Sequence, residues 1–147
     1  MKKLMEQIIK FGFVGVVCFL IDFAITIGLY HILINVTTKM IATGVGGFFG
    51  FTISVVVNYI LSMKFVFERK EDMSRKKEFV IFVILSLIGL GLNEALLLAC
   101  RVGYEASDLL KIFNDTLWLA ISKIFATAVV MVYNFISRKI FLEKKAA

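Results

Sequence analysis

Ionisable residues inside long apolar stretches are the first candidates for chemistry in this chain. Asp22, Glu94 and Lys123 each lie well inside such a stretch, and Asn93 precedes Glu94. An ionisable side chain near the middle of a bilayer raises the free energy of insertion by about 2.5–3.5 kcal/mol, so each one requires a reason. At 1.5 Å per residue, all three lie about 18–24 Å from the charged residues at one end of their stretch. Their similar depth predicts either a polar site in which the lysine binds an anion, or a pairing of Lys123 with Glu94 or Asp22 that holds helices together.

Further polar residues share faces or ends with this group. Thr127 and Asn134 follow Lys123 by four and 11 residues, which places all three on one face of a helix. Asn58 lies about 9 Å from Lys64 along its helix, where it can bind a partner helix or a ligand headgroup. The full set of candidate binding residues is Lys123, Asp22, Asn93, Glu94, Asn58, Asn134, Lys64, Arg138, Lys139 and Thr127.

The sequence lacks the motifs of common catalytic and metal sites. It contains no Walker loop, no His-Glu-x-x-His zinc motif and no Gly-x-Ser-x-Gly nucleophile elbow. His31 is the single histidine, which makes a metal site improbable, and no nucleophile accompanies Asp22 and Glu94. We therefore expect no enzymatic activity, no cofactor, no metal and no nucleic-acid partner.

Four apolar stretches must position these residues. The chain has 147 residues, of which 60% are hydrophobic and 19% charged, with no proline. Soluble domains are usually about 45–50% apolar and 25% charged. A helix needs about 20 residues to cross a bilayer, and each stretch meets that length. The stretches are residues 11–34, 40–63, 79–100 and 117–137.

The sequence therefore predicts an all-α integral membrane protein with one membrane domain over residues 1–147. We expect transmembrane helices at about 8–34, 40–64, 78–101 and 117–138, a cytoplasmic loop at 65–77, and a short amphipathic helix in the outer interfacial segment 102–116. Thirteen of the 17 Lys and Arg residues lie at the N-terminus, in or beside the central loop, or in the tail, and three lie in the other two connections. By the positive-inside rule, both termini are expected to be cytoplasmic.

The two halves of the sequence are similar. The second and fourth stretches both end with an asparagine followed by an aromatic residue, then a basic residue and a phenylalanine. Two helices per half give both halves the same orientation, a form of internal repeat that is common among transporters. Small or polar residues at every fourth position of the second stretch favour close packing against another helix. They are Gly46, Gly50, Ser54, Asn58 and Ser62.

Several of these motifs resemble the GtrA-like family of small four-helix membrane proteins. Lys123 resembles the intramembrane lysine of that family. The other motifs that carry the resemblance are Lys10-Phe-Gly-Phe-Val-Gly15 with Asp22, Asn58-Tyr with Lys64-Phe-Val-Phe67, and Asn134-Phe with Arg138-Lys139 and Phe141. Together they cover residues 10–141.

The resemblance implies a part in cell-envelope glycosylation. Members of the family are expected to move a polyprenyl-phosphate-linked monosaccharide, such as undecaprenyl-phosphate glucose, from the inner to the outer leaflet, where it decorates O-antigen or teichoic acid. The residues are compatible with this: Lys64, Arg138 and Lys139 would collect the phosphate, with hydrogen bonds from Asn58 and Asn134. Lys123 would receive the phosphate deeper in the membrane. Asp22, Asn93 and Glu94 would bind sugar hydroxyls.

The implied partners follow from this function. They are the lipid-linked sugar, the bilayer of the bacterial cytoplasmic membrane and glycosyltransferases on either side of it. Because four helices barely enclose a sugar, we also expect a homo-oligomer. Two alternatives remain open: a non-transporting anchor or scaffold for a polyprenyl-phosphate glycosyltransferase, and a small proton-coupled transporter that binds cations at Asp22 or Glu94.

Overall fold

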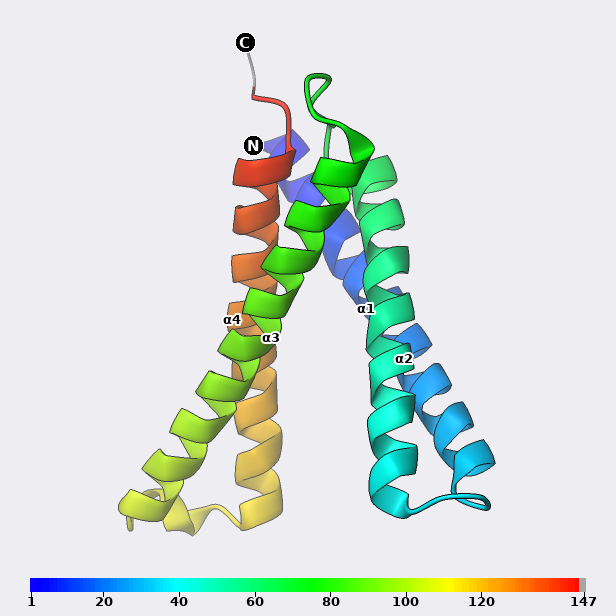
Figure 1. The fold of residues 1–147 in the computed structure, drawn as a ribbon. Helices are drawn as coiled ribbons and strands as arrows, with labels where there is room; N and C mark the ends of the chain where they lie inside the picture. Colours follow the sequence, from blue (N-terminus) through cyan, green and yellow to red (C-terminus); the bar gives the residue numbers. More distant parts are fainter. Residues whose placement is uncertain (146–147) are drawn as a thin grey trace. The chain divides into compact units, whose positions relative to one another are not determined.

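Four long α-helices make up most of the described chain. The computed structural model describes residues 1–145, apart from the side chains of residues 115 and 116. Its elements, drawn in Figure 1, are α1 (Lys2–Leu33), α2 (Lys39–Leu61), a π-helical turn η1 (Ser62–Val66), α3 (Arg75–Ala106), a 3-10 turn η2 (Leu110–Ile112) and α4 (Asp115–Leu142). All four long helices have the length and apolar composition needed to cross a membrane. The prediction of an all-α protein with four transmembrane helices is confirmed.

The connection between α3 and α4 differs from the expected amphipathic helix over 102–116. α3 continues to Ala106, beyond its expected end near residue 101, and only the three-residue turn η2 follows before α4. Arg101 forms an ion pair with Glu105 four residues later, with an N–O distance of 2.7 Å. Such an exposed pair adds about 0.2–0.5 kcal/mol to the last turns of α3, outside the apolar stretch.

Asn114 caps the N-terminus of α4. Its Oδ1 accepts a hydrogen bond from the backbone N–H of Leu117 at 2.7 Å. Replacing an N-cap asparagine with alanine usually destabilises a helix by about 1 kcal/mol. We expect Asn114→Ala to speed hydrogen exchange at the Leu117 amide, whereas Asn114→Ser, which keeps an acceptor, should not. Equal exchange in all three proteins would contradict the cap.

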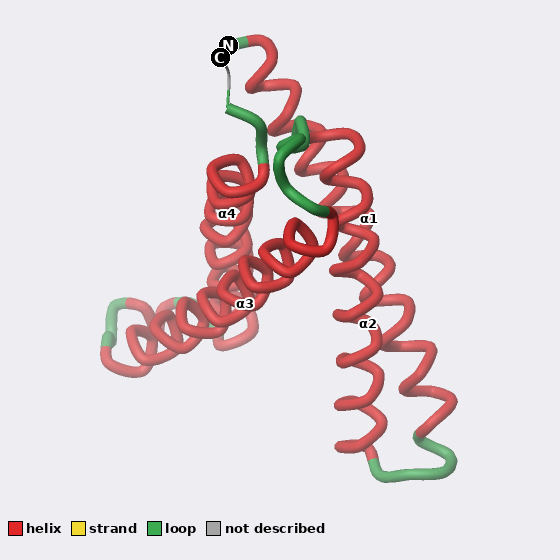
Figure 2. Tube along the Cα trace, turned by 45° about the horizontal axis from the view of Figure 1, so that its top comes forward, coloured by secondary structure: helices red, strands yellow, loops and turns green. Residues whose placement is uncertain are grey.

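The chain divides into two compact units, each built on one pair of antiparallel helices. Unit 1 comprises residues 1–74 together with the C-terminal segment from Leu142, and so contains α1, α2 and η1. Unit 2 comprises residues 75–141 and contains α3, η2 and α4. Figure 2 shows the two helices of each pair joined at one end by a loop. The division between residues 74 and 75 separates the two sequence halves that resemble each other.

The small residues of α2 let it approach α1 closely. Ser54 Oγ donates a hydrogen bond to the Cys18 carbonyl at 3.0 Å, and Thr26 Oγ1 donates one to the Gly46 carbonyl at 3.3 Å. A Cβ atom placed on Gly46 would lie 2.7 Å from the Thr26 carbonyl oxygen, which is shorter than real contacts allow. The predicted packing ridge is therefore present, and it packs against α1.

The C-terminal segment packs against the start of α1. Leu142 is fully buried, and Gln7 and Glu143 are only 6% and 9% exposed. Gln7 Nε2 donates hydrogen bonds to a carboxylate oxygen of Glu143 and, at 3.0 Å, to the Val66 carbonyl. One buried amide thus joins α1, η1 and the C-terminal segment.

Two further contacts fix this segment. The backbone N–H of Lys144 donates to the Glu68 carbonyl at 2.7 Å, and Lys144 Nζ donates to a carboxylate oxygen of Glu71 at 3.0 Å. That hydrogen bond and the charge of Glu71 raise the pKa of Lys144 above its usual value. The tail and the loop after η1 therefore lie at the same end of unit 1 as the N-terminus.

Removing the Glu143 carboxylate should loosen this end of unit 1. Leaving a buried amide without one of its acceptors costs about 1–3 kcal/mol, so we expect Glu143→Ala to lower the free energy of unfolding by that amount. Thermal unfolding in detergent would measure it. Glu143→Gln keeps an acceptor oxygen and should lose less, and Lys145→Ala, at an exposed neighbouring position, should lose almost nothing. Identical stability of the Glu143→Ala and Lys145→Ala proteins would contradict the role of the cluster.

Candidate functional site

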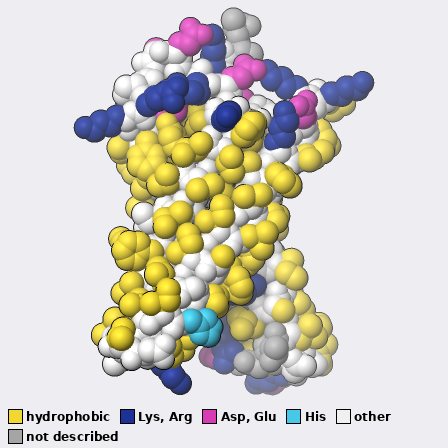
Figure 3. Space-filling model, turned by 90° about the vertical axis from the view of Figure 1, so that its right-hand side faces the viewer, with side chains coloured by type: hydrophobic (Ala, Val, Ile, Leu, Met, Phe, Trp, Pro, Cys, Tyr) yellow, Lys and Arg dark blue, Asp and Glu magenta, His cyan; other side chains and the backbone are white. Residues whose placement is uncertain are grey.

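The sides of the helices are apolar, so the few polar groups on them stand out. Figure 3 shows the α1–α2 side of the molecule, where hydrophobic side chains cover the helices and Lys and Arg lie at the two ends, more of them at the top. Many large apolar side chains of the helices are exposed, including Phe13 at 71% and Phe19 at 65% on α1. In a membrane protein such a surface faces lipid. Charged groups within it require a function or a partner.

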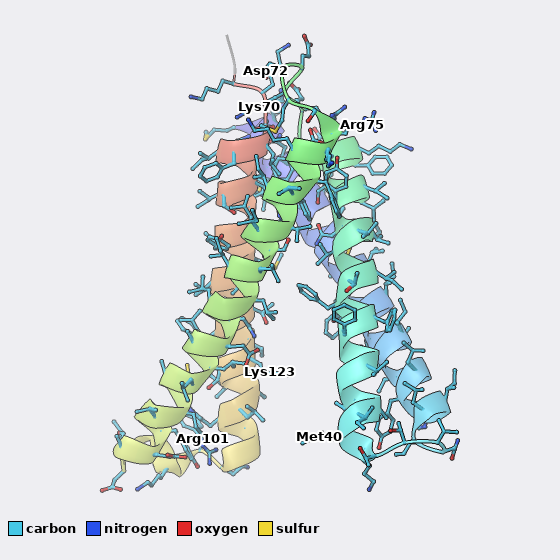
Figure 4. The ribbon with its side chains drawn as sticks, in the orientation of Figure 1. Met40, Lys70, Asp72, Arg75, Arg101 and Lys123 are labelled. Carbon is cyan, nitrogen blue, oxygen red and sulfur yellow. The ribbon has the colours of Figure 1, made fainter. Side chains whose placement is uncertain are left out.

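Lys123 is exposed on α4 and forms no ion pair with any described side chain of unit 2. The predicted pairing with Glu94 is therefore not formed within unit 2. Figure 4 shows Lys123 on α4 some distance in from the end of unit 2 that carries Arg101. The adjacent face of α4, with Ser122 4% exposed and Ala126 fully buried, packs inward. Lys123 lies beside that packed face and not within it.

The other polar residues in the transmembrane part of unit 2, at about the depth of Lys123, lie on both of its long helices. On α3, Asn93 Nδ2 donates to a carboxylate oxygen of Glu94 at 3.2 Å, and Glu94 is exposed. On α4, Thr127 is also exposed, one helical turn from Lys123. Unit 2 thus carries an amide, a carboxylate, a hydroxyl and an ammonium group in its transmembrane part.

Asp22 lies at the contact between α1 and α2. It is half-buried, and its carboxylate accepts a hydrogen bond from Thr26 Oγ1 at 3.3 Å. A Cβ atom on Gly50 would lie 2.8 Å from the Asp22 carbonyl oxygen. Asp22 therefore has a packing position in unit 1, and the sugar-binding role that the family resemblance implies for it stays a prediction.

Two of the predicted phosphate-collecting residues lie near the end of α4. Arg138 is buried, its Nη2 donates to Ser86 Oγ at 3.0 Å, and its guanidinium carbon lies 4.0 Å from the ring centroid of Phe82. The Lys139 ammonium lies 6.0 Å from the ring centroid of Phe135. Cation–π contacts of this kind favour a retained charge in a largely apolar setting. Arg138 thus also joins α4 to α3.

The two predicted asparagines have different surroundings. Asn134 Oδ1 is buried and has no hydrogen-bond donor among the described residues, and a Cβ atom on Gly89 would lie 3.0 Å from it. Asn58 Oδ1 accepts a hydrogen bond from Ser62 Oγ at 2.9 Å, at the start of η1. A buried acceptor with no donor, as at Asn134, is unusual and is often found at functional positions.

Lys64 lies in a polar pocket that the sequence analysis did not find. The pocket has a volume of about 280 Å³. It lies between the first turns of α1 on one side and η1 with the two residues after it on the other. We call it the headgroup pocket. Its polar lining comprises Lys3, Glu6, Gln7, Lys10, Lys64 and Glu68. The lining residues of α1 recur every three or four positions and so share one helix face, a signal that was present in the sequence.

The π-helical turn shapes one side of this pocket. The backbone N–H of Phe67 donates to the carbonyl of Ser62, five residues earlier, at 2.9 Å. Met63 and Val66 are buried, whereas Lys64 and Phe65 are exposed. The turn therefore presents Lys64 and Phe65 outward at the end of α2. Single π-helical turns are rare and occur frequently at functional sites.

An apolar groove adjoins the headgroup pocket. It has a volume of about 450 Å³ and is lined by Ile9, Lys10, Phe13, Val14, Leu61 and Phe65. We call it the chain groove. Lys10 and Phe65 line both spaces, so the polar pocket and the apolar groove adjoin at these two residues.

Comparison with known proteins gives one match. The family model described as GtrA/DPMS, transmembrane domain, matches residues 10–142. No curated protein and no solved structure matches the chain.

Proposed function

The chain belongs to the GtrA/DPMS transmembrane-domain family, and on this basis we propose that it translocates a polyprenyl-phosphate-linked monosaccharide from the inner to the outer leaflet. Membership of this family supports a role for the chain in polyprenyl-phosphate sugar translocation or glycosylation. The four apolar helices make the chain a multi-pass membrane protein. The substrate joins an apolar chain, one phosphate and a sugar, so its path needs a cation and hydrogen-bonding groups within the membrane.

Lys123 is the observation that supports this proposal most strongly. An ammonium group that pairs with a carboxylate serves to hold helices together, but Lys123 has no such partner among the described residues of unit 2. A cation without a carboxylate partner raises the free energy of inserting a transmembrane helix, and by default it indicates a ligand or transport site. We propose that Lys123 binds the phosphate of the lipid while the lipid crosses the membrane.

The other candidate residues divide between the two parts of this path. At the inner end, Lys64, Arg138 and Lys139 attract the phosphate, and Asn58 and Asn134 offer hydrogen bonds. Deeper in the membrane, carboxylate and amide groups accept hydrogen bonds from sugar hydroxyls. The residues that we assign to the sugar are Asp22, Asn93, Glu94 and Thr127.

The orientation of the chain in the membrane and the driving force for transport form part of the same proposal. We place both termini in the cytoplasm and the chain in a bacterial cytoplasmic membrane, because the basic residues gather at the ends expected there. Consumption of the sugar by an outer glycosyltransferase drives transport downhill. No covalent bond is made or broken by this chain, which acts as a homo-oligomer.

Reconstitution tests the proposal directly. Purified protein in liposomes should speed leaflet exchange of a short-chain polyprenyl-phosphate glucose, measured by its accessibility to a membrane-impermeant reagent added outside. Protein-free liposomes and liposomes with an unrelated four-helix membrane protein serve as controls. Exchange no faster than in these controls, with restored glycosylation in cells, would favour the anchor alternative. Proton-linked uptake of a lipophilic cation would favour the cation transporter.

A further inference from the structure

We propose that the headgroup pocket and the chain groove together form a docking site for the phosphate-bearing end of the carrier lipid. This inference rests on the proposed function and adds the place where the lipid is first held, which lies entirely within unit 1. The phosphate lies against Lys10 and Lys64, and the first part of the prenyl chain lies along Ile9, Phe13 and Leu61.

The charges of the headgroup pocket leave one cation uncompensated. Lys3 forms an ion pair with Glu68 at 2.7 Å, and Lys10 forms one with Glu6. Lys64 forms no ion pair with a described residue, and its ammonium lies 5.2 Å from the ring centroid of Phe65. A sugar-linked phosphodiester carries one negative charge and a prenyl phosphate monoester carries about one to two, so either headgroup supplies an anion for Lys64. Lys10 can also contribute, because an ammonium group has three donors and Glu6 occupies only one.

The Glu6 carboxylate of the pocket suits a headgroup that carries hydroxyls. Glu6 retains acceptor capacity beyond its ion pair with Lys10, since an ionised carboxylate has about four lone-pair sites. A sugar linked to the phosphate would place hydroxyl donors within the same pocket of about 280 Å³. The pocket therefore offers groups for both parts of a sugar-phosphate headgroup.

The chain groove is open to lipid and begins at the pocket. Ile9, Phe13 and Phe65 are 66%, 71% and 53% exposed, so a lipid chain reaches them from the bilayer without any opening of the protein. Lys10 and Phe65 line both spaces, so a lipid whose phosphate lies in the pocket can place the start of its chain in the groove. The order of polar and apolar groups along this surface is the order found in a prenyl phosphate.

Binding of undecaprenyl phosphate to the full-length protein tests the site. Native mass spectrometry in phosphatidylcholine nanodiscs would give the dissociation constant for the wild type and for the double variant Lys10→Gln/Lys64→Gln. We expect the double variant to bind at least about tenfold more weakly, because two charge-assisted hydrogen bonds are lost. The double variant Lys2→Gln/Lys70→Gln makes the same change in charge outside the pocket and should change affinity less than about twofold.

A second pair of variants tests the groove. Phe13→Ala removes an apolar side chain from it, whereas Phe19→Ala removes an equally exposed phenylalanine elsewhere on α1. We expect about fivefold weaker binding for Phe13→Ala and no change for Phe19→Ala. Undecaprenol, which lacks the phosphate, should not compete with undecaprenyl phosphate.

Two results would overturn the docking site. One is equal affinity of the wild type and the Lys10→Gln/Lys64→Gln variant, and the other is displacement of undecaprenyl phosphate by an equal concentration of phosphatidylglycerol, which would indicate a site for bulk phospholipid. Transport separates this inference from the proposed function. If the lysine variant exchanges lipid at the wild-type rate, only the docking site fails, and if the wild type binds the lipid without exchanging it, only the translocation fails.

Discussion

Replacing Lys123 with alanine should lower the rate of leaflet exchange by about 10- to 100-fold, since a hydrogen bond to a charged group contributes about 1.5–3 kcal/mol. The same change should leave the protein at least as stable as the wild type. A lysine inside the hydrocarbon region raises the free energy of insertion by about 2.5–3.5 kcal/mol, and Lys123 has no ion-pair partner among the described residues of unit 2 whose loss would offset that gain. Exchange in liposomes and thermal unfolding in detergent would be measured on the same preparations.

Three further variants make this prediction specific. Lys123→Arg keeps the charge and should retain much of the exchange, whereas Lys123→Met keeps the length without the charge and should behave like alanine. Lys111→Ala removes an exposed lysine of unit 2 that pairs with Asp108 at 2.7 Å, and should not alter exchange. A loss of stability in Lys123→Ala that matches its loss of exchange would instead assign the lysine to holding the helices together.

The fold could be predicted because hydropathy and length suffice for it. Four uncharged or nearly uncharged stretches of about 20 residues have few other stable states than transmembrane helices. The helix ends were less predictable, because a helix does not stop where the apolar stretch stops. α3 runs on through Arg101 to Ala106, and no hydropathy signal marks the π-helical turn at Ser62–Val66 or the return of Leu142 to unit 1.

The candidate site could be predicted only in part, for a related reason. Spacing along one helix placed Lys123 and Thr127 on a common face, since helical periodicity is a local property. The headgroup pocket depends on Gln7, whose amide reaches the Val66 carbonyl, 59 positions away in the sequence. No local pattern contains such a contact. The burial of Arg138 against Phe82 and Ser86 likewise depends on the pairing of α3 with α4.

Gly50→Ala should destabilise unit 1 by about 1–3 kcal/mol, the usual cost of adding atoms to a tightly packed contact. A Cβ atom at this position would lie 2.8 Å from the carbonyl oxygen of Asp22, and a backbone atom of α1 cannot move aside without moving the helix. A loss of stability would be informative, because alanine in a helix is normally about 0.5–1 kcal/mol more favourable than glycine. Steric trapping or thermal unfolding in detergent would measure the change.

Gly47→Ala is the matched control, three residues earlier on α2. A Cβ atom there would meet no described atom within 4 Å, so only the gain in helix propensity should remain, and this variant should be neutral or slightly stabilised. A loss of stability in Gly50→Ala together with a gain in Gly47→Ala would show that α1 and α2 touch along the glycine face in the membrane. If Gly50→Ala were as stable as Gly47→Ala, α2 would not approach α1 at Asp22, and Asp22 would be available to a ligand and not held in a helix contact.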